Sequence, residues 1–364
     1  MKMMMKKRKR LRWYALTVLA VSFLVLEITK TMVPADDYQM KIEAAVRTKA
    51  CMEFVHQLKL ERGVPIDMAN DVNQTGVIGQ EYSGITTTLG SLEAKRTSTN
   101  PNMAAIVIDM FQELGLKEGD QVAINCSGSF PALNMAVMCA AETMGLDPIL
   151  MSSFGSSTHG ANDPELTYLD MEHFLYEEGL LSHKSRYFSI GGMLDMGLEM
   201  QQSEVKKIVE RLTGYGYEKI SSEDLIENVK NRYKLYDQYG DIRCFINVGG
   251  NDVAFGDSSV MVHADGGLLT ELSEKDHSTG LVQLFLKDGI PVIHLLNMKG
   301  LAADYGLPVD PVPIPEIGQG SVYYMIRYET WIAVVGFVVP FLLLWLGREN
   351  KKRNTENERR MDTL

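Results

Sequence analysis

The chain contains only four cysteines in 364 residues, Cys51, Cys126, Cys139 and Cys244, and no C-x-x-C spacing relates any two of them. This dispersed pattern predicts neither a zinc site nor a disulfide framework. The signatures H-E-x-x-H, G-x-x-x-x-G-K-[ST] and G-x-S-x-G do not occur either. We therefore expect no bound metal, no cofactor, no phosphate-binding loop of the usual ATPase kind and no nucleophile elbow of a hydrolase.

Positive charge is scarce outside the two ends of the chain. Residues 1–12 hold seven Lys or Arg and no acid, and residues 347–364 hold six Lys or Arg with four acids. Taking these from the totals of 36 basic and 47 acidic residues leaves 23 and 43 for residues 13–346, a net charge of −20. A body of this charge repels nucleic acid, so we expect no nucleic-acid partner.

An apolar segment follows the basic N-terminal tail. Residues 13–26 carry no charge, and the segment reaches residue 33 if Glu27 and Lys30 lie at the far interface, which is long enough to span a bilayer. A cleaved signal peptide is the alternative, because residues 33–35 loosely resemble a cleavage site. Pro34 and the charged residues before it favour an uncleaved transmembrane helix over residues 13–33, after a cytoplasmic tail of residues 1–12.

A second apolar segment, residues 331–346, lies near the other end. Its 16 residues would rise about 24 Å as a helix, slightly less than the hydrocarbon core. Aromatic flanks and the basic residues that follow favour a transmembrane helix over a buried C-terminal helix. By the positive-inside rule we expect both termini, including the tail of residues 347–364, in the cytoplasm of a cell-membrane protein. Residues 36–325 would then be extracytoplasmic, with membrane lipid as a partner.

The rest of the chain is organised around residues 121–153. An apolar strand at 122–124 leads into the turn Ser127-Gly128-Ser129, a helix that starts at Pro131 and ends at Gly145, and a second strand at 148–151. Such a unit almost always makes a right-handed parallel crossover. Ligands of parallel sheets bind beyond the carboxyl ends of the strands, near helix N-termini.

Strands and helices continue to alternate on both sides of this unit. Further strands are predicted at 186–190, 242–248 and 290–296, and helices at 36–62, 101–114, 164–178, 204–212 and 222–239. The alternation predicts an α/β domain with a mostly parallel sheet and helices on both faces. We expect this domain to be flanked by the two transmembrane helices. A proline-rich link, residues 306–320, leads to the second one.

Residues 63–100 show no clear periodicity, and a long loop in a compact protein is either disordered or functional. They contain Lys95 and Arg96, a cationic pair inside an acidic body, with Thr97 and other hydroxyl residues around it. Cations and hydroxyls together suit a carboxylate or a phosphate. An ordinary solvated pair is the alternative, because exposed charges are common.

The predicted strand ends carry small and polar residues that would gather at one edge of a parallel sheet. These edge candidates also include Ser156, Asp195, His294, Asn297 and Lys299. For ligand binding we single out Lys95, Arg96, Thr97, Ser127, Gly128, Ser129, His159, Asn162, Gly191, Gly192, Gly249, Gly250 and Asn251. A catalytic set of Ser129, His159 and Asp195 is possible by composition, but a triad is defined by geometry.

Three long strings carry a family resemblance. They are GQEYSGITTTLGSLEAKRTSTNPNMAA, GDQVAINCSGSFPALN and SSTHGANDPELTYLDME, which together fall within residues 79–172. The chain resembles the poly-γ-glutamate system protein family, bacterial membrane proteins encoded with the machinery that makes and exports poly-γ-glutamate. The similarity runs through most of residues 10–345 and includes an N-terminal anchor. It implies a role in making, exporting or handling the polymer, and it implies no particular reaction or catalytic residue.

We therefore expect an accessory membrane component of poly-γ-glutamate biosynthesis or export. It would bind glutamate or the nascent polymer, or dock other membrane subunits of the synthase and export complex. A non-catalytic role is favoured. An extracytoplasmic hydrolase or transferase of γ-glutamyl bonds, and a structural scaffold without a ligand, remain open alternatives.

Overall fold

The computed structural model describes residues 2–220, 224–256, 266–272 and 279–361, without side chains for residues 2–8, 347 and 350–361. The chain divides into two compact units, which are described separately below. One consists of Met1–Ala35 with Tyr324–Leu364, and the other of Asp36–Tyr323. The predicted extracytoplasmic domain ended two residues later, at residue 325.

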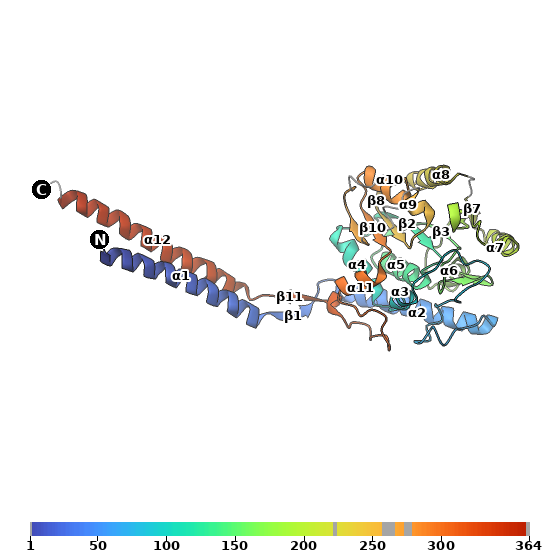
Figure 1. Ribbon diagram of the computed structural model, residues 1–364, viewed down its shortest axis with the longest axis horizontal. Helices are drawn as coiled ribbons and strands as arrows, with labels where there is room; N and C mark the ends of the chain where they lie inside the picture. The colour runs from blue at the N-terminus through green and yellow to red at the C-terminus, as the bar shows by residue number, and fades with distance from the viewer. Residues whose placement is uncertain (1, 221–223, 257–265, 273–278, 362–364) are drawn as a thin grey trace. The chain divides into compact units, whose positions relative to one another are not determined.

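The first unit is a helical hairpin made from the two ends of the chain. Helix α1 (Lys2–Thr29) packs against α12 (Thr330–Met361), and strands β1 (Thr31–Pro34) and β11 (Tyr324–Arg327) form an antiparallel pair beside them (Figure 1). The predicted extension of the first helix to residue 33 is wrong, because residues 31–34 pair with β11 as a strand.

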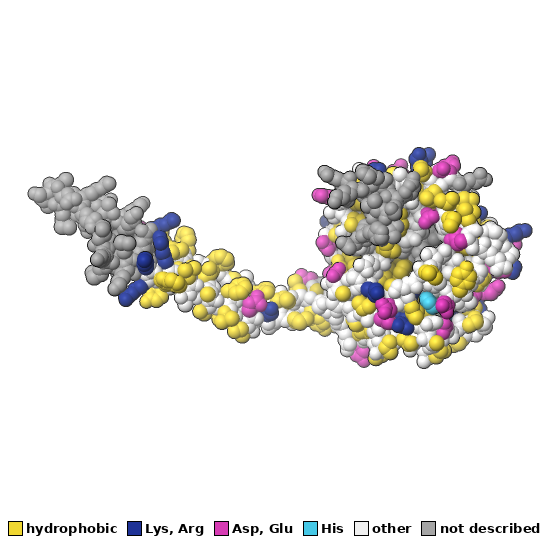
Figure 2. Space-filling view, in the orientation of Figure 1, with side chains coloured by type: hydrophobic (Ala, Val, Ile, Leu, Met, Phe, Trp, Pro, Cys, Tyr) yellow, Lys and Arg dark blue, Asp and Glu magenta, His cyan; other side chains and the backbone are white. Residues whose placement is uncertain are grey.

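Small residues allow the two helices of the hairpin to approach closely. A Cβ atom on Gly336 would lie 2.7 Å from Ser22 Cβ, so only glycine fits at this crossing. Large apolar side chains point outward instead; Phe23 is 66% and Phe337 73% exposed. Figure 2 shows hydrophobic side chains over the hairpin, with Lys and Arg side chains gathered toward one end of the hydrophobic stretch.

Only one helix in the described part of the chain is long and apolar enough to cross a membrane by length and composition. It is the segment Lys9–Thr29 of α1. The apolar part of α12, Thr330–Leu346, is shorter. The second predicted transmembrane helix therefore exists as a helix, and its insertion into a membrane stays a prediction.

The second unit is built on a seven-stranded sheet with the order β7-β6-β3-β2-β8-β10-β9. All neighbouring strands are parallel except β9 and β10, which confirms the predicted α/β class with a mostly parallel sheet. The strands are β2 (Gln121–Ser127), β3 (Asp147–Ser153), β6 (Tyr187–Ser189), β7 (Glu218–Lys219), β8 (Ile242–Val248), β9 (Gly267–Leu269) and β10 (Val292–Leu295).

Helices cover both faces of this sheet (Figure 1). Ile124 and Ile246 point to the face covered by α2, α4 and α5, whereas Ala123 and Phe245 point to the face covered by α8, α9 and α10. The helices of this unit are α2 (Tyr38–Arg62), α3 (Leu92–Ser98), α4 (Met103–Glu113), α5 (Pro131–Thr143), α6 (Tyr168–Glu177), α7 (Gln202–Gly214), α8 (Leu225–Asp237), α9 (Asp252–Phe255), α10 (Leu281–Lys287) and α11 (Met298–Asp304), with short 3₁₀ turns η1 (Met193–Asp195) and η3 (Ser321–Tyr323).

The strand order reverses at β2. From β2 the chain moves outward through β3, β6 and β7, and it then returns to add β8 on the opposite side of β2. In open sheets of this kind the ligand crevice lies outside the carboxyl ends of the strands at the point of reversal. The topology therefore directs attention to the carboxyl ends of β2 and β8.

The predicted long loop of residues 63–100 is only partly a loop. Residues 92–98 form α3, and the side chain of Ser91 caps it by accepting a hydrogen bond from Ala94 N–H. The next helix begins at Met103 rather than at Pro101, because the Asn100 side chain accepts from Asn102 N–H two residues on. Lys95 and Arg96 therefore lie on a helix.

The predicted helix start at Asp163-Pro164 is wrong by several residues. Strands β4 (Asn162–Asp163) and β5 (Leu166–Thr167) form a small hairpin there, and α6 follows it. Thr167 and Asp170 form a capping box that stabilises this later start. Strands β7 and β9 were not predicted, because two or three residues carry too little alternation to recognise. The first residues of the predicted helix 222–239 lie outside the described residues.

Candidate functional site

Polar side chains replace apolar ones near the carboxyl end of the sheet, on the face covered by α8, α9 and α10. Asn125, Asn247 and His294 are register partners on β2, β8 and β10. Ser153 and Ser189 are partners on β3 and β6. We call these five buried residues the polar row. Residues two apart on a strand share a face, so Asn125 continues the face of the apolar Ala123.

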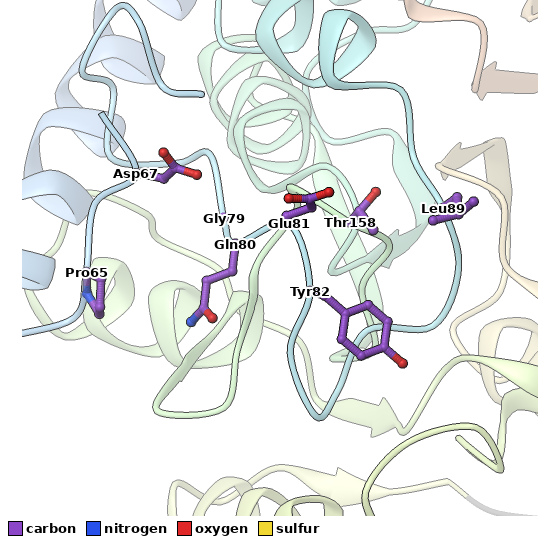
Figure 3. Close-up of a pocket in the computed structure, with 8 residues that line it drawn as sticks. All are labelled: Pro65, Asp67, Gly79, Gln80, Glu81, Tyr82, Leu89 and Thr158. Atoms are coloured by element: carbon purple, nitrogen blue, oxygen red, sulfur yellow. The ribbon is translucent and has the colours of Figure 1, made fainter. Parts of the chain in front are cut away.

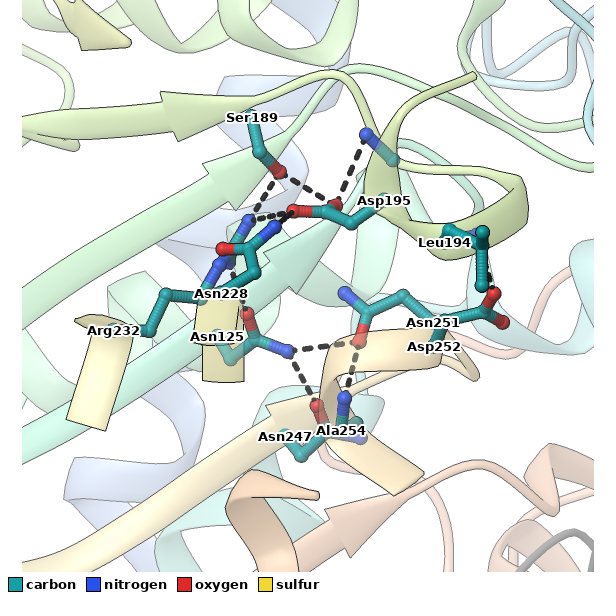
Figure 4. Close-up of polar contacts among 11 residues, drawn as sticks. Asn125, Ser189, Leu194, Asp195, Asn228, Arg232, Asn247, Asn251, Asp252 and Ala254 are labelled. Atoms are coloured by element: carbon teal, nitrogen blue, oxygen red, sulfur yellow. Dashed lines mark hydrogen bonds and ion pairs between the residues drawn. The ribbon is translucent and has the colours of Figure 1, made fainter. Parts of the chain in front are cut away.

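Hydrogen bonds give the polar row one direction, from donor to acceptor (Figure 4). Arg232 on α8 donates to Asn125 Oδ1 at 3.2 Å. Asn125 Nδ2 then donates to Asn247 Oδ1 at 2.7 Å and to Asn251 Oδ1 at 3.2 Å. Because arginine has donors only, it fixes the orientation of the Asn125 amide, and that amide fixes the next two.

His294 lies at one end of this series. Asn247 Oδ1 is taken by Asn125, so Asn247 Nδ2 is the donor toward His294 Nδ1, at 3.1 Å. Nδ1 is therefore the acceptor, and the neutral ring carries its proton on Nε2. Burial lowers the pKa of His294 to about 4, which keeps the ring neutral near pH 7.

Four buried polar atoms at this edge have no partner among the described residues. They are Asn251 Nδ2, His294 Nε2, Ser127 Oγ and Ser153 Oγ. Each of them can donate a hydrogen bond, and leaving such a buried group unsatisfied costs about 1–3 kcal/mol. A ligand with several acceptor oxygens would satisfy them.

Arg232 also forms a buried ion pair with Asp195 beside the polar row. The Asp195 carboxylate accepts from Arg232 Nη2 and from Asn228 Nδ2 at 2.8 Å, from Ser189 Oγ at 2.7 Å and from Gly191 N–H at 3.1 Å. Figure 4 shows these donors converging on the carboxylate from β6 and α8. Because all these bonds are made inside the protein, Asp195 holds the 191–195 turn against the sheet.

The backbone of this turn is strained. Leu194 and Asp195 both adopt left-handed conformations, with φ of 55° and 63°. Each such residue costs on the order of 1–3 kcal/mol, and strain of this kind concentrates at functional sites. Leu194 N–H donates to Asp252 Oδ2 at 2.7 Å, so the strained turn is tied to the first residue of α9.

Gly249 allows the carboxyl end of β8 to approach that of β2. Its φ is +85°, and a Cβ atom would lie 2.5 Å from Ser127 Oγ. Neither the conformation nor the space accepts a side chain. Gly249 therefore brings the carboxyl ends of β2 and β8 close together.

The structure brings eight of the predicted site residues together at the carboxyl ends of β2, β6 and β8. They are Ser127, Gly128, Gly191, Gly192, Asp195, Gly249, Gly250 and Asn251. Lys95, Arg96 and Thr97 lie on α3, and His159 and Asn162 follow β3 in segment 156–163. Asn162 Nδ2 donates to Gln80 O at 2.8 Å, so it ties β4 to the segment before α3. Ligand binding by any of these residues stays a prediction.

Lys95 and Arg96 do not act as one cationic pair. Arg96 forms a bidentate ion pair with Asp310, and Thr97 Oγ1 accepts from Asp310 N–H at 2.9 Å. Lys95 is buried and donates to Ser129 O and Ser157 Oγ. The two neighbours on α3 therefore serve different parts of the fold.

No hydrogen bond joins Ser129, His159 and Asp195 to one another in the described structure. Ser129 Oγ accepts from Ser157 N–H at 3.0 Å, and the Asp195 carboxylate is occupied by the donors named above. His159 adopts a left-handed conformation with φ of 61°, and its buried Nδ1 has no partner among the described residues. This arrangement gives no histidine oriented by Asp195 toward a serine.

A cavity of 490 Å³ lies outside the crevice, beside the segments before α3 and after β3. It is lined by Pro65, Asp67, Gly79, Gln80, Glu81, Tyr82, Leu89 and Thr158 (Figure 3). In the residues that the structure describes, no group of three or more His, Cys, Asp or Glu is placed to hold a metal ion.

Sequence reasoning missed the residues that organise the crevice. Asn125 and Asn247 interrupt otherwise apolar strands, in the matching strings INC and INV, and a polar residue inside a buried strand is a signal that could have identified them. Arg232 carries no such signal, because a basic residue on a charged helix resembles an exposed one. Only its burial reveals its role.

The fold and the site define an α/β domain with a doubly wound sheet and buried polar side chains at its topological switch point, where open sheets of this kind have their ligand crevice. No family model, no curated protein and no solved structure matches the chain.

Proposed function

We propose that the chain is an accessory membrane component of poly-γ-glutamate biosynthesis or export, and that its crevice binds glutamyl carboxylates. The observation that carries the binding role is the set of unpartnered buried donors at the carboxyl ends of the strands, Ser127 Oγ, Ser153 Oγ, Asn251 Nδ2 and His294 Nε2. The choice of poly-γ-glutamate as the polymer rests on the family resemblance of residues 79–172.

A carboxylate suits this set because it offers two acceptor oxygens and no donor. The amide series that starts at Arg232 aims the donor of Asn251, and the same series assigns a proton to His294 Nε2. Donors held in advance by a buried network need no reorganisation when an anion binds. We therefore expect the site to prefer anions, because the network directs donor hydrogens of Asn251 and His294 toward the ligand.

The strong negative charge of the body limits how such a ligand is captured. A net −20 over residues 13–346 repels a polyanion at long range, so binding depends on contacts with individual carboxylates. This favours binding a chain end or one or two glutamyl units over coating a long stretch of polymer.

The membrane location proposed here has both termini in the cytoplasm, and residues 36–325 outside the cell. Its support is the length and composition of α1, the close contact of Ser22 with Gly336 in the hairpin, and the basic residues at both ends of the chain. In this arrangement the crevice meets polymer that has left the cytoplasm. Other membrane subunits of the synthase and export complex would contact the hairpin.

The test is calorimetric titration of the full chain in detergent with glutamate and with γ-glutamyl oligomers of several lengths. Charge-assisted hydrogen bonds contribute about 1.5–3 kcal/mol, so Asn251→Ala should weaken binding by about tenfold to a hundredfold. Affinity should also fall with added salt. Gln238→Ala, at an exposed position on the C-terminal end of α8, is the control and should bind as the parent does.

A parent protein that binds none of these ligands would overturn the binding role and favour a scaffold without ligand. Equal affinity of the parent and Asn251→Ala would place binding elsewhere than in this crevice. Thermal unfolding of each variant distinguishes lost contacts from a damaged fold.

A further inference from the structure

Lys95 is a buried amine without a counter-ion. Its side chain is 2% exposed, and in the described residues it forms no ion pair with a carboxylate. Its Nζ atom lies 2.7 Å from Ser157 Oγ and 3.9 Å from the centroid of the Phe130 ring, and it donates to the carbonyl oxygen of Ser129. Burial lowers the pKa of Lys95 to about 7, so a large share of the amine is neutral at neutral pH.

Ser157 is placed to use this amine. Its N–H donates to Ser129 Oγ at 3.0 Å, which fixes its backbone beside the start of α5. Lys95 Nζ is the only described group that bonds to Ser157 Oγ. When the amine is neutral, the hydroxyl can donate its proton to the nitrogen, which is the relation between a nucleophile and its base.

The N-terminus of α5 adds electrostatic support beside this pair. Phe130, the residue before the first turn, offers no side-chain cap, so the first N–H groups of this 13-residue helix have no side-chain acceptor there. Ser129, which precedes Phe130, forms hydrogen bonds with both Lys95 and Ser157. Partial positive charge at a helix N-terminus stabilises an oxyanion.

The cavity of 490 Å³ is lined by a residue next to Ser157 along the chain. Two residues that line it are Thr158, which follows Ser157 in the sequence, and Leu89, which precedes Gly90 (Figure 3). The backbone of Gly90 covers the pair, since a Cβ there would lie 2.9 Å from Ser157 Oγ and 3.0 Å from Lys95 Cε. Four hydrogen bonds tie the covering segment 87–90 to segment 156–158. They run from Thr87 N–H to Ser156 O, from Thr158 N–H to Thr88 O, from Gly90 N–H to Thr158 Oγ1 and from Thr158 Oγ1 to Gly90 O.

We propose that Ser157 and Lys95 form a nucleophile and base that cleave or transfer acyl amides of aliphatic amines, the acyl group being γ-glutamyl. Asp67 and Glu81 in the cavity wall favour a leaving group that becomes an ammonium ion. The choice of γ-glutamyl as the acyl group rests on the proposed function. The assignment of Ser157 and Lys95 as nucleophile and base does not rest on it. The reaction goes beyond the binding role of the crevice.

The step balances without a cofactor. Ser157 Oγ bonds to the carbonyl carbon while its proton passes to Lys95 Nζ. The carbon–nitrogen bond then breaks, and the amine leaves with that proton. Water or a second amine then bonds to the carbonyl carbon of the resulting ester and gives a proton to Lys95 Nζ. The bond from that carbon to Ser157 Oγ breaks and Oγ takes the proton from Lys95, which releases the acyl product and restores both residues.

The first test needs no substrate. In the full chain in detergent, Ser157→Cys should react with iodoacetamide at a lower pH than the exposed control Ser182→Cys, because a neighbouring lysine takes the thiol proton. Adding Lys95→Met should shift that pH profile upward. A Ser157→Cys protein that stays unmodified when folded, or a profile that Lys95→Met leaves unchanged, overturns the proposal. Mass spectrometry assigns the modified residue, since the four native cysteines are buried.

The second test measures release of amine from γ-glutamyl amides of aliphatic amines. Ser157→Ala and Lys95→Met should each lower the rate on the order of 10³-fold, whereas the exposed controls Ser182→Ala and Lys206→Met should retain it. The parent rate should rise as pH increases through about 7. No turnover by a parent whose Ser157→Cys variant is reactive overturns the amide substrate. That failure is independent of carboxylate binding in the crevice, which the Asn251→Ala titration measures.

Discussion

Arg232 Nη2 donates to Asp195 Oδ2 at 2.8 Å, and neither side chain is exposed to solvent. The same guanidinium reaches Asn125 on the central strand through Nη1. One residue on α8 therefore connects the strained turn after β6 with the amide series of the crevice. Arg232 neutralises the charge of the Asp195 carboxylate, and through Asn125 it fixes the orientation of the Asn251 amide.

Replacing Arg232 should be far more damaging than replacing an exposed cation. Arg232→Met leaves the Asp195 carboxylate buried and unpaired, so the free energy of unfolding should fall by about 3–5 kcal/mol. Lys206→Met, which removes an exposed pair with Glu210 on α7, should change it by less than about 1 kcal/mol. Urea unfolding of the full chain in detergent, followed by circular dichroism, measures both. Similar values for the two variants would contradict a structural role of the buried pair.

His294 should make the protein less stable in acid. Its folded pKa of about 4 lies below the ordinary value of 6.5, so the unfolded chain binds more protons between these values and stability rises with pH across that window. The parent should therefore gain about 3 kcal/mol over His294→Gln between pH 4 and pH 7. Glu172, whose pKa burial raises to about 7, acts in the opposite sense. Hence the difference between parent and variant isolates His294, and a difference independent of pH would refute the assignment.

Gly249 should not tolerate a methyl group. The positive φ and the 2.5 Å approach of a Cβ to Ser127 Oγ predict that Gly249→Ala lowers the free energy of unfolding by about 1–3 kcal/mol. The matched control is Gly214→Ala at the end of α7, where a Cβ meets open space and φ is ordinary. That change should be neutral or stabilise by up to about 1 kcal/mol. Thermal unfolding compares them, and equal effects would contradict the close approach.

Membrane topology can be tested with cysteines placed by exposure, in a background without the native cysteines. Leu89 is a suitable position because its side chain is 87% exposed. Leu89→Cys should react with a membrane-impermeant thiol reagent in intact spheroplasts. Asn354→Cys should react only after lysis, because the proposed topology places the basic C-terminal tail in the cytoplasm. Labelling of Leu89→Cys only after lysis would place the domain in the cytoplasm and contradict the proposed handling of exported polymer.

Local sequence was sufficient for the framework of the fold. Residues 121–153 predicted β2, α5 and β3, and runs of β-branched and apolar residues predicted β6, β8 and β10, because buried parallel strands are apolar throughout. The glycine-rich strand ends were recognised for the same local reason, since a tight turn after a strand needs small residues.

The crevice itself was decided by tertiary structure. Asn125 forms a hydrogen bond with Arg232, which lies 107 residues further along the chain. Lys95 likewise bonds to Ser157, which is 62 residues away in the sequence. Local patterns do not encode which distant side chains share a low-dielectric interior. The sequence by itself determined an α/β domain with polar strand ends and apolar segments at both termini. The packing of α3 and α8 decided that Lys95 and Arg232 are buried rather than solvated, because a cation loses its water only when other elements close over it.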